Sequence, residues 1–455
     1  MKKRTLARAG LALSVAVAAT LFGCASTGPQ GPIVALKGAT MIDGTGAPPV
    51  PNAVILIADG KIVSAGAAST VAIPSGARVV ELNGKTVLPG LISNHAHIGI
   101  VEGTQSRPEN YNREFIGTQL KQFEALGVTT VTSLGMNGPL FYEMRTQLKE
   151  GKIQGADILG ADRGIGVEAG APPAAIVSIA TNQIYRPKTP EEARAAVAEM
   201  NGRGTDLVKV WLDDFGKSLP TKVAPSIYAA VVDEAHKRNL RVAAHIHDMD
   251  DAKAILAVGG DIVAHGVRDK PVDAEFINLM KQRSAWYIAT LALDDSNFIF
   301  ADRPEVGTDP LVAPWIHPQM KALISDPAWQ ARARATPGAA NARRDLAMGK
   351  SNLLAVYKAG IPVGFGSDAG VGLRVPGIAE HRELVLMVEA GLTPMESLTI
   401  ATSNAARLLR LDDRGSIKAG KRADLLVLDA DPLQNIANTL RINSVWHRGV
   451  LVRGN

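Results

Sequence analysis

The chain has 455 residues, which exceeds the length at which a single hydrophobic core stops growing, so we expect at least two structural units. Hydrophobic residues make up 46% of the chain and charged residues 20%, a composition that is typical of globular proteins and excludes a largely disordered one. The formal net charge of +5 falls to +1 without the basic residues at positions 2, 3, 4 and 8, which argues against a nucleic-acid-binding surface.

Residues 1–24 have the pattern of a secretory leader. Basic residues precede the apolar segment 11–22, which is shorter than the roughly 20 residues of a membrane-spanning helix. The segment ends in Leu21-Phe22-Gly23-Cys24, which resembles a bacterial lipoprotein cleavage box, and Cys24 is the only cysteine. We therefore expect an exported, periplasmic protein, anchored to a bacterial membrane through lipid on Cys24, with residues 25–32 as a tether. The alternative is an ordinary signal peptide in which Cys24 is incidental.

Two β-rich segments lie at opposite ends of the remaining chain. Residues 33–86 alternate in hydrophobicity around the hairpin signal Asp59-Gly60, and residues 415–455 contain a strand at 423–428 and a hairpin around Arg448-Gly449. Because each segment is too small to fold alone, we expect the two to form one small β-sandwich domain together.

Between these segments, residues 87–414 alternate apolar strands with amphipathic helices, the pattern of a parallel α/β architecture. The predicted helices include 114–126, 190–201, 224–238 and 394–410, and the predicted strands are 87–95, 128–133, 157–161, 206–211, 240–246, 261–265, 286–292 and 361–367. Eight such strands predict a (β/α)₈ TIM barrel, whose chemistry sits at the C-terminal ends of the strands. The proline-rich connection 294–336 is predicted to be a structureless cover over the barrel mouth.

Metal-binding residue types occur at the ends of these strands. His95 and His97 are spaced i, i+2, so in an extended strand both imidazoles can bind one ion. The other candidates lie at the ends of four more of the predicted strands: Lys209, His245 with His247 two residues on, His265, and Asp368. Any one of them could be a buried polar residue without a function, and Lys209 alone is more typical of a salt-bridged lysine. Their shared position at strand ends indicates a metal site at the barrel mouth.

The run Pro89-Gly90-Leu91-Ile92-Ser93-Asn94-His95-Ala96-His97 resembles the signature of the amidohydrolase superfamily, in which an aspartate usually stands two residues before the first histidine; here that position is Ser93. The spacing of Lys209, His245 and His265 is similar to the branch that holds imidazolonepropionase-like proteins, prolidases and ochratoxin-type amidases. The resemblance implies two divalent ions, with zinc expected. One would be held by His95, His97 and Asp368, the other by His245 and His265, and Lys209 would bridge them as a CO₂-derived carbamate.

These ligands predict a metal-dependent amidohydrolase that cleaves a C–N amide bond of a dipeptide, an Xaa-Pro peptide or an N-acyl amino acid with a metal-activated hydroxide, Asp368 carrying the proton. A cyclic-amide or imidazolone-type hydrolase and a non-catalytic metal-binding lipoprotein are the alternatives.

A substrate carboxylate is expected to bind an arginine above the metals, Arg268 or Arg374, unless these pair with acids such as Asp269 or Asp273. His247 is a further substrate-binding candidate, since only one of the 245/247 pair is expected to be a ligand. The small-molecule amide and the membrane are the expected partners, and a homo-oligomer remains open.

Overall fold

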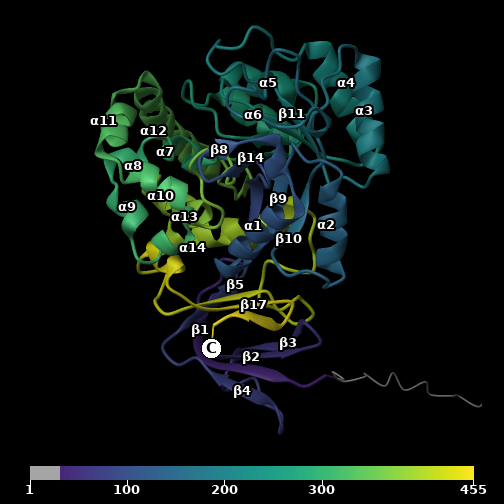
Figure 1. Cartoon of the computed structure of the whole chain (residues 1–455). Helices are drawn as coiled ribbons and strands as arrows, with labels where there is room; N and C mark the ends of the chain where they lie inside the picture. The colour runs from purple at the N-terminus through teal and green to yellow at the C-terminus, as the bar shows by residue number, and fades with distance from the viewer. Residues whose placement is uncertain (1–30, 455) are drawn as a thin grey trace, which may run out of the picture.

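The computed structural model describes residues 31–454, so the predicted leader and Cys24 lie outside the described residues. The chain forms a small β domain, at the bottom of Figure 1, and a larger α/β domain above it, which the chain enters and leaves through the β domain. No helix within the described range is long and apolar enough to cross a membrane.

The two ends of the chain together build the β domain. Its strands form one mixed sheet in the order β18-β17-β16-β5-β1-β2-β3, with β4 pairing with β1. The strands are β1 (Val34–Met41), β2 (Val50–Ala58), β3 (Lys61–Ala67), β4 (Arg78–Glu81), β5 (Thr86–Pro89), β16 (Leu425–Leu428), β17 (Ile442–His447) and β18 (Val450–Arg453). The strand β5 joins the two segments in one sheet, since it pairs with β1 on one side and with β16 on the other.

The sheet of the β domain curls around its own core. The N–H of Ile62 in β3 donates to the carbonyl of Lys421, just before β16, over 2.8 Å. The Arg78 guanidinium of β4 lies 5.7 Å from the ring centroid of Trp446 in β17. The expected sandwich is therefore made of two layers of one continuous sheet, with Leu36, Ile55 and Leu425 among the side chains buried between them.

The larger domain is a (β/α)₈ barrel, as the sequence predicts. Its parallel strands form two hydrogen-bonded groups, β10-β9-β6 and β11-β12-β13-β14-β15. Their bounds are β6 (Leu91–Ala96), β9 (Val128–Leu134), β10 (Asp157–Ala161), β11 (Val208–Trp211), β12 (Val242–His245), β13 (Ile262–Ala264), β14 (Trp286–Ile288) and β15 (Val363–Gly364).

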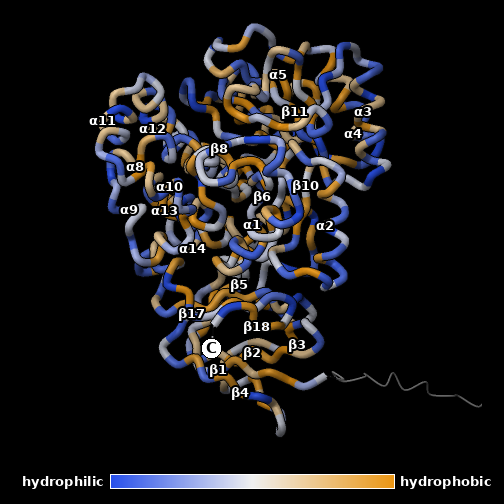
Figure 2. The backbone as a smooth tube through the Cα atoms, viewed as in Figure 1, coloured by the Kyte–Doolittle hydropathy of each residue, from blue (hydrophilic) through white to orange (hydrophobic). Residues whose placement is uncertain are grey.

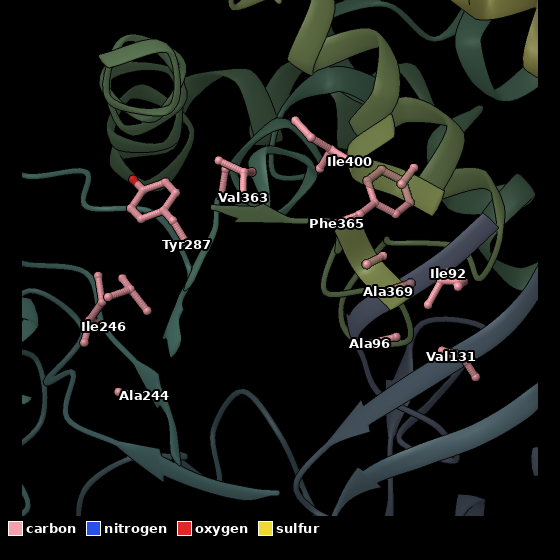
Figure 3. Close-up of a cluster of buried hydrophobic side chains, with 14 of the residues drawn as sticks. Ile92, Ala96, Val131, Ala244, Ile246, Tyr287, Val363, Phe365, Ala369 and Ile400 are labelled. Carbon is pink, nitrogen blue, oxygen red and sulfur yellow. The ribbon is translucent and has the colours of Figure 1, made fainter. Parts of the chain in front are cut away.

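Hydrogen bonds beyond the regular ladders close the barrel at two seams. At one seam, Ile165, which follows β10, donates to the carbonyl of Lys209 in β11 over 2.7 Å. At the other, the N–H of His97 after β6 donates to the carbonyl of Ala369 after β15 over 2.7 Å. Figure 3 shows this second seam from the apolar side, where Ile92 and Ala96 lie close to Phe365 and Ala369. The first and the last barrel strand are therefore neighbours.

Helices cover the outside of the barrel, and their polar sides face outward (Figure 2). Those that follow the barrel strands are α1 (Arg113–Ala125), α2 (Leu140–Lys149), α3 (Pro190–Gly202), α4 (Pro225–Lys237), α5 (Met249–Ala257), α6 (Ala274–Arg283), α7 (Leu291–Asp295), α12 (Pro337–Lys358), α13 (Ile378–Glu389), α14 (Pro394–Thr399) and α15 (Ala405–Leu408). A π-helical turn (Ile400–Asn404) joins the last two, within the predicted helix 394–410. Local signals start several of these helices: Thr393, for example, accepts a hydrogen bond from the Glu396 N–H and precedes a proline.

The prediction that residues 294–336 are structureless is wrong. This segment contains α8 (Ile299–Asp302), α9 (Glu305–Thr308), α10 (Pro318–Ile324) and α11 (Pro327–Ala335), which lie at the left of Figure 1. Prolines begin helices here instead of preventing them, because a proline at the first helical position loses no hydrogen bond. Asp326, for example, accepts from the Ala328 N–H and precedes Pro327.

Candidate metal centre

Two histidines and an aspartate meet where the barrel closes between β6 and β15. The Nε2 atoms of His95 and His97 lie 3.4 and 3.1 Å from Oδ1 of Asp368. The backbone fixes this arrangement, because the N–H of Asp368 donates to the carbonyl of His95 over 2.9 Å. Gly366 permits the close approach, since a Cβ atom there would lie 2.6 Å from Cβ of His95. One potential ligand atom from each of the three residues lies within 4.8 Å of the others, as one ion requires.

Two further imidazoles extend this cluster along the barrel mouth. The ring of His265, after β13, lies with its centroid 4.4 Å from that of His95 and 4.2 Å from that of His245 at the end of β12. Both are held from behind: Nδ1 of His265 is 2.8 Å from Oγ1 of Thr290, and Nε2 of His245 is 3.3 Å from Oδ2 of Asp213. Contacts of this kind orient a ring nitrogen toward a metal.

Lys209 reaches the same cluster from β11. It is completely buried, and its Nζ atom has no hydrogen-bond partner among the described residues. Burial lowers the pKa of this amine to about 7, against the opposing attraction of Asp368. A large fraction of Lys209 side chains is therefore neutral at neutral pH.

The protonation states suit metal binding. Burial lowers the pKa of His95 and of His265 well below the usual value, so that both rings are neutral and offer a lone pair. Burial lowers the pKa of His245 to about 4, although Asp213 opposes the change. Burial would raise the pKa of Asp368, but the Arg374 guanidinium and the neighbouring histidines hold it below its ordinary range.

The donor set fits divalent cations. Within residues 31–454, both ring nitrogens of His95, Nδ1 of His97 and Nζ of Lys209 are buried without a hydrogen-bond partner. Unpaired buried polar atoms are costly and rare in native proteins unless something else binds them. Nitrogen and carboxylate donors in close proximity are the set that zinc and similar ions prefer.

A cavity of about 330 Å³ lies beside these residues. His245 forms part of its wall, with Phe215 stacked on the imidazole at a centroid distance of 5.5 Å. Charged side chains line the rest, in particular His247, Arg268, Asp294, Arg344 and Asp345. A small polar substrate in this cavity would contact His245, the one candidate metal ligand in its wall.

The structure places the two candidate arginines in different positions. Arg268 lines the cavity and is buried; its Nη1 lies 3.1 Å from Asp294 Oδ1, so its acid partner is neither Asp269 nor Asp273. Its Nε has no partner among the residues described. Arg374 contacts Asp368 instead: Nη2 donates to Oδ2 over 2.8 Å, and Nε donates to the main-chain carbonyl over 2.6 Å.

Both ring nitrogens of His247 contact carboxylates outside the candidate metal ligands. Its Nδ1 lies 2.6 Å from Asp248 Oδ1 and its Nε2 lies 3.3 Å from Asp345 Oδ2. Burial lowers the pKa of His247, but these carboxylates outweigh burial and raise it to about 9. The imidazolium is therefore a cationic part of the cavity wall.

Sequence analysis missed two carboxylates that contact the candidate metal ligands or their neighbours. Asp213 follows the end of β11, so the rule that polar residues after barrel strands are functional would have found it. Glu380 lies inside α13 and is not part of any recognisable sequence motif. Its carboxylate nevertheless accepts hydrogen bonds from Ser93 and Ser367. Nothing in the local pattern distinguishes it from a solvent-exposed helical glutamate.

Comparisons with known proteins agree with this geometry. Residues 86–452 match the Amidohydrolase family. The crystal structure of a putative prolidase from Bifidobacterium longum superimposes with a TM-score of 0.74 at 26% sequence identity, covering 92% of this chain and 94% of that one. Ochratoxinase from Aspergillus niger is 26% identical over 275 residues, 58% of this chain and 50% of the enzyme.

Shorter similarities reach other proteins. An uncharacterized protein of Mycobacterium bovis is 30% identical over 246 residues, 53% of this chain and 56% of that protein. The chain thus spans about half the length of these curated relatives. The family match, by contrast, runs from β5 to β18 and includes every residue of the candidate metal centre. The chain is a member of the amidohydrolase family.

Proposed function

We propose that this protein is a metal-dependent hydrolase that cleaves the C–N amide bond of a small substrate with a free carboxylate, such as a dipeptide, an Xaa-Pro peptide or an N-acyl amino acid. The observation that carries the proposal is the convergence of four buried imidazoles, Asp368 and the unpartnered amine of Lys209 beside a charged cavity. Similarity to a putative prolidase and to ochratoxinase favours an amide substrate.

The expected ligands divide into two sets. His95, His97 and Asp368 would hold one divalent ion, and His245 and His265 the other. Bound ions of this kind supply Lewis acidity and a water molecule of lowered pKa.

Lys209 would join the two sets as a carbamate. The lone pair of its neutral amine would attack the carbon of CO₂, so that a C–N bond forms while one C=O π bond opens and its electron pair passes to oxygen; loss of one proton from nitrogen to water would then leave an anionic carbamate. The lowered pKa of Lys209 favours this step, because only the neutral amine is nucleophilic.

Asp368 and its neighbours would move the proton. Arg374 keeps the Asp368 carboxylate ionised, so it can accept a proton from the attacking water and return it to the leaving nitrogen. On the cavity side, the guanidinium groups of Arg268 and Arg344 and the imidazolium of His247 are the cationic groups that could bind a substrate carboxylate.

The test is hydrolysis of dipeptides and N-acyl amino acids by purified protein, before and after removal of metal with a chelator. Chelation should abolish turnover, and zinc should restore it. Lys209→Ala should lose activity and regain part of it with short carboxylic acids, whereas His236→Ala, at an exposed position on α4, serves as the control. Turnover that survives complete metal removal would overturn the proposal.

We also propose that the mature protein is exported and lipid-anchored. The support is the leader sequence alone, in which basic residues, an apolar segment and Cys24 follow one another.

A further inference from the structure

Glu380 is a buried carboxylate that joins three separate parts of the chain. Its Oε1 accepts hydrogen bonds from the hydroxyl of Ser93 over 3.0 Å and from that of Ser367 over 2.7 Å. Its Oε2 accepts from the N–H of Gly377 over 2.8 Å at the start of α13. Both oxygens are therefore fixed, and the carboxylate has no exposure to solvent.

The two serines stand next to the candidate metal ligands. Ser93 lies in β6, two residues before His95, and Ser367 directly precedes Asp368 after β15. One carboxylate oxygen thus connects the two strands at the seam where the barrel closes. Buried carboxylates are costly, and burial raises the pKa of Glu380 to about 7 although the serines lower it. A position that retains such a group despite this cost is a candidate for a functional role.

Ser93 occupies the position at which the superfamily signature carries an aspartate. We infer that Glu380 is a positioning residue that supplies this carboxylate from α13, and that its two serine hydrogen bonds set the separation between His95 with His97 and Asp368. The inference rests on the metal centre of the proposed function. It predicts that losing the Glu380 charge weakens metal binding more than it weakens the fold.

The same helix offers a matched control. Glu383 is also buried, and its carboxylate accepts from the N–H groups of Leu291 and Ala292 over 2.9 and 2.7 Å. In the described part of the chain its hydrogen bonds go to the start of α7 and not to β6 or β15. Burial raises the pKa of Glu383 to about 8, similar to that of Glu380. The two glutamates therefore differ mainly in the groups to which they are hydrogen-bonded.

The experiment compares zinc affinity in Glu380→Gln and Glu383→Gln, by competition with a coloured chelator, and the melting temperatures of the metal-free proteins. Residues that support metal ligands typically change affinity by about 10- to 100-fold, which is the loss expected for Glu380→Gln. Glu383→Gln should lower the melting temperature and reduce zinc affinity clearly less than Glu380→Gln does, because its contacts lie next to Thr290 behind His265 and not at β6 or β15. Equal zinc affinity in Glu380→Gln and wild type would overturn the inference.

Moving the charge gives a second, independent readout. Ser93→Asp in the wild-type background places a second carboxylate against Glu380, and like-charge repulsion should weaken zinc binding. In the Glu380→Gln background the same change should restore zinc affinity to within about threefold of wild type. A double variant that binds zinc no better than Glu380→Gln would overturn the inference.

Failure of the proposed function gives a different result. A wild-type protein that binds zinc but cleaves no amide would refute the proposed function and leave the Glu380 comparison intact. A wild-type protein that cleaves amides with unchanged zinc affinity in Glu380→Gln would refute the positioning role alone.

Discussion

Replacement of Lys209 by methionine is expected to stabilise the metal-free protein while it removes metal-dependent function. Lys209 is buried, and no described group accepts a hydrogen bond from its amine. Methionine is an unbranched side chain of similar length, so it can keep the packing of the lysine stem and remove the polar atom. The substitution therefore separates the cost of burying the amine from the benefit of the proposed carbamate.

The magnitude follows from the pKa of Lys209, which burial lowers from 10.5 to about 7. At 1.36 kcal/mol for each pKa unit, the cost of burying this amine at pH 7 is about 4 kcal/mol. The unfolded chain binds a proton at any pH below about 10.5, and the folded chain only below about 7. The cost is therefore complete below pH 7, decreases as the pH rises, and vanishes above about 10.5.

The assay is urea unfolding of chelator-treated wild type and Lys209→Met at pH 7 and pH 10. We expect the variant to be more stable by about 2–4 kcal/mol at pH 7 and by less than about 1 kcal/mol at pH 10. Lys152→Met, at an exposed position, should change stability by less than about 0.5 kcal/mol at either pH. With zinc and bicarbonate present the order should reverse, because only the wild type can form the carbamate.

A metal-free Lys209→Met protein that is no more stable than wild type at pH 7 would refute this reasoning. So would a stability gain that is the same at pH 7 and pH 10, since titration of the amine could then not be its cause.

Two substitutions and one measurement on the mature N-terminus test separate parts of the protein. Burial lowers the pKa of His447, but the nearby carboxylates of Asp157 and Glu124, at 3.7 and 2.5 Å, raise it to about 9. Its contribution to stability is therefore complete below pH 6.5 and lost as the pH rises to about 9. Thermal unfolding of His447→Gln should show a deficit at pH 6 that disappears at pH 9.5, and a pH-independent deficit would contradict this. Arg374→Lys should lower kcat by about 10- to 100-fold and change KM less than threefold, because Arg374 contacts Asp368 and does not line the proposed substrate cavity. If steady-state kinetics show a large rise in KM alone, Arg374 binds the substrate instead. Mass spectrometry of the mature N-terminus should find a lipid-modified Cys24, and an unmodified residue other than Cys24 would rule out the anchor.

The barrel was predictable because its strands are short apolar runs bounded by polar residues. The strand β9 begins at Val128 as predicted, and β10 has the predicted bounds, 157–161. Parallel strands that are buried on both faces are continuous apolar runs in the sequence. The small β domain was predictable for another reason, since two short segments with a β pattern flank the barrel pattern at the two ends of the chain.

The segment 294–336 shows where local reasoning gave the wrong result. Its many prolines suggested an irregular connection, but Asp326-Pro327 and Thr336-Pro337 are helix starts of the same kind as Thr393-Pro394. A proline counts against a helix only in its interior, so position within the segment decides.

Contacts between elements that are distant in the chain could not be predicted from the sequence. Asp269 and Asp273 were the alternative partners considered for Arg268, but its partner is Asp294, 26 residues away on α7. Glu380 and Ser93 are 287 residues apart and meet only because the barrel closes. Pairings of this kind depend on how helices pack on the closed barrel, which residue patterns along single elements do not encode.

The closure of the barrel between β6 and β15 has a consequence for folding kinetics. Asn94 and Phe365 are hydrogen-bonded to each other although 271 residues separate them. Contacts with such long loops between them form late, because the entropy of closing the loop must be overcome before the contact gains anything. His95 and His97 therefore leave the ribosome long before Asp368 exists, and the complete ion site assembles only when the last barrel strand docks. Ion capture should thus be a final event of folding, one that locks an already formed barrel and does not nucleate it.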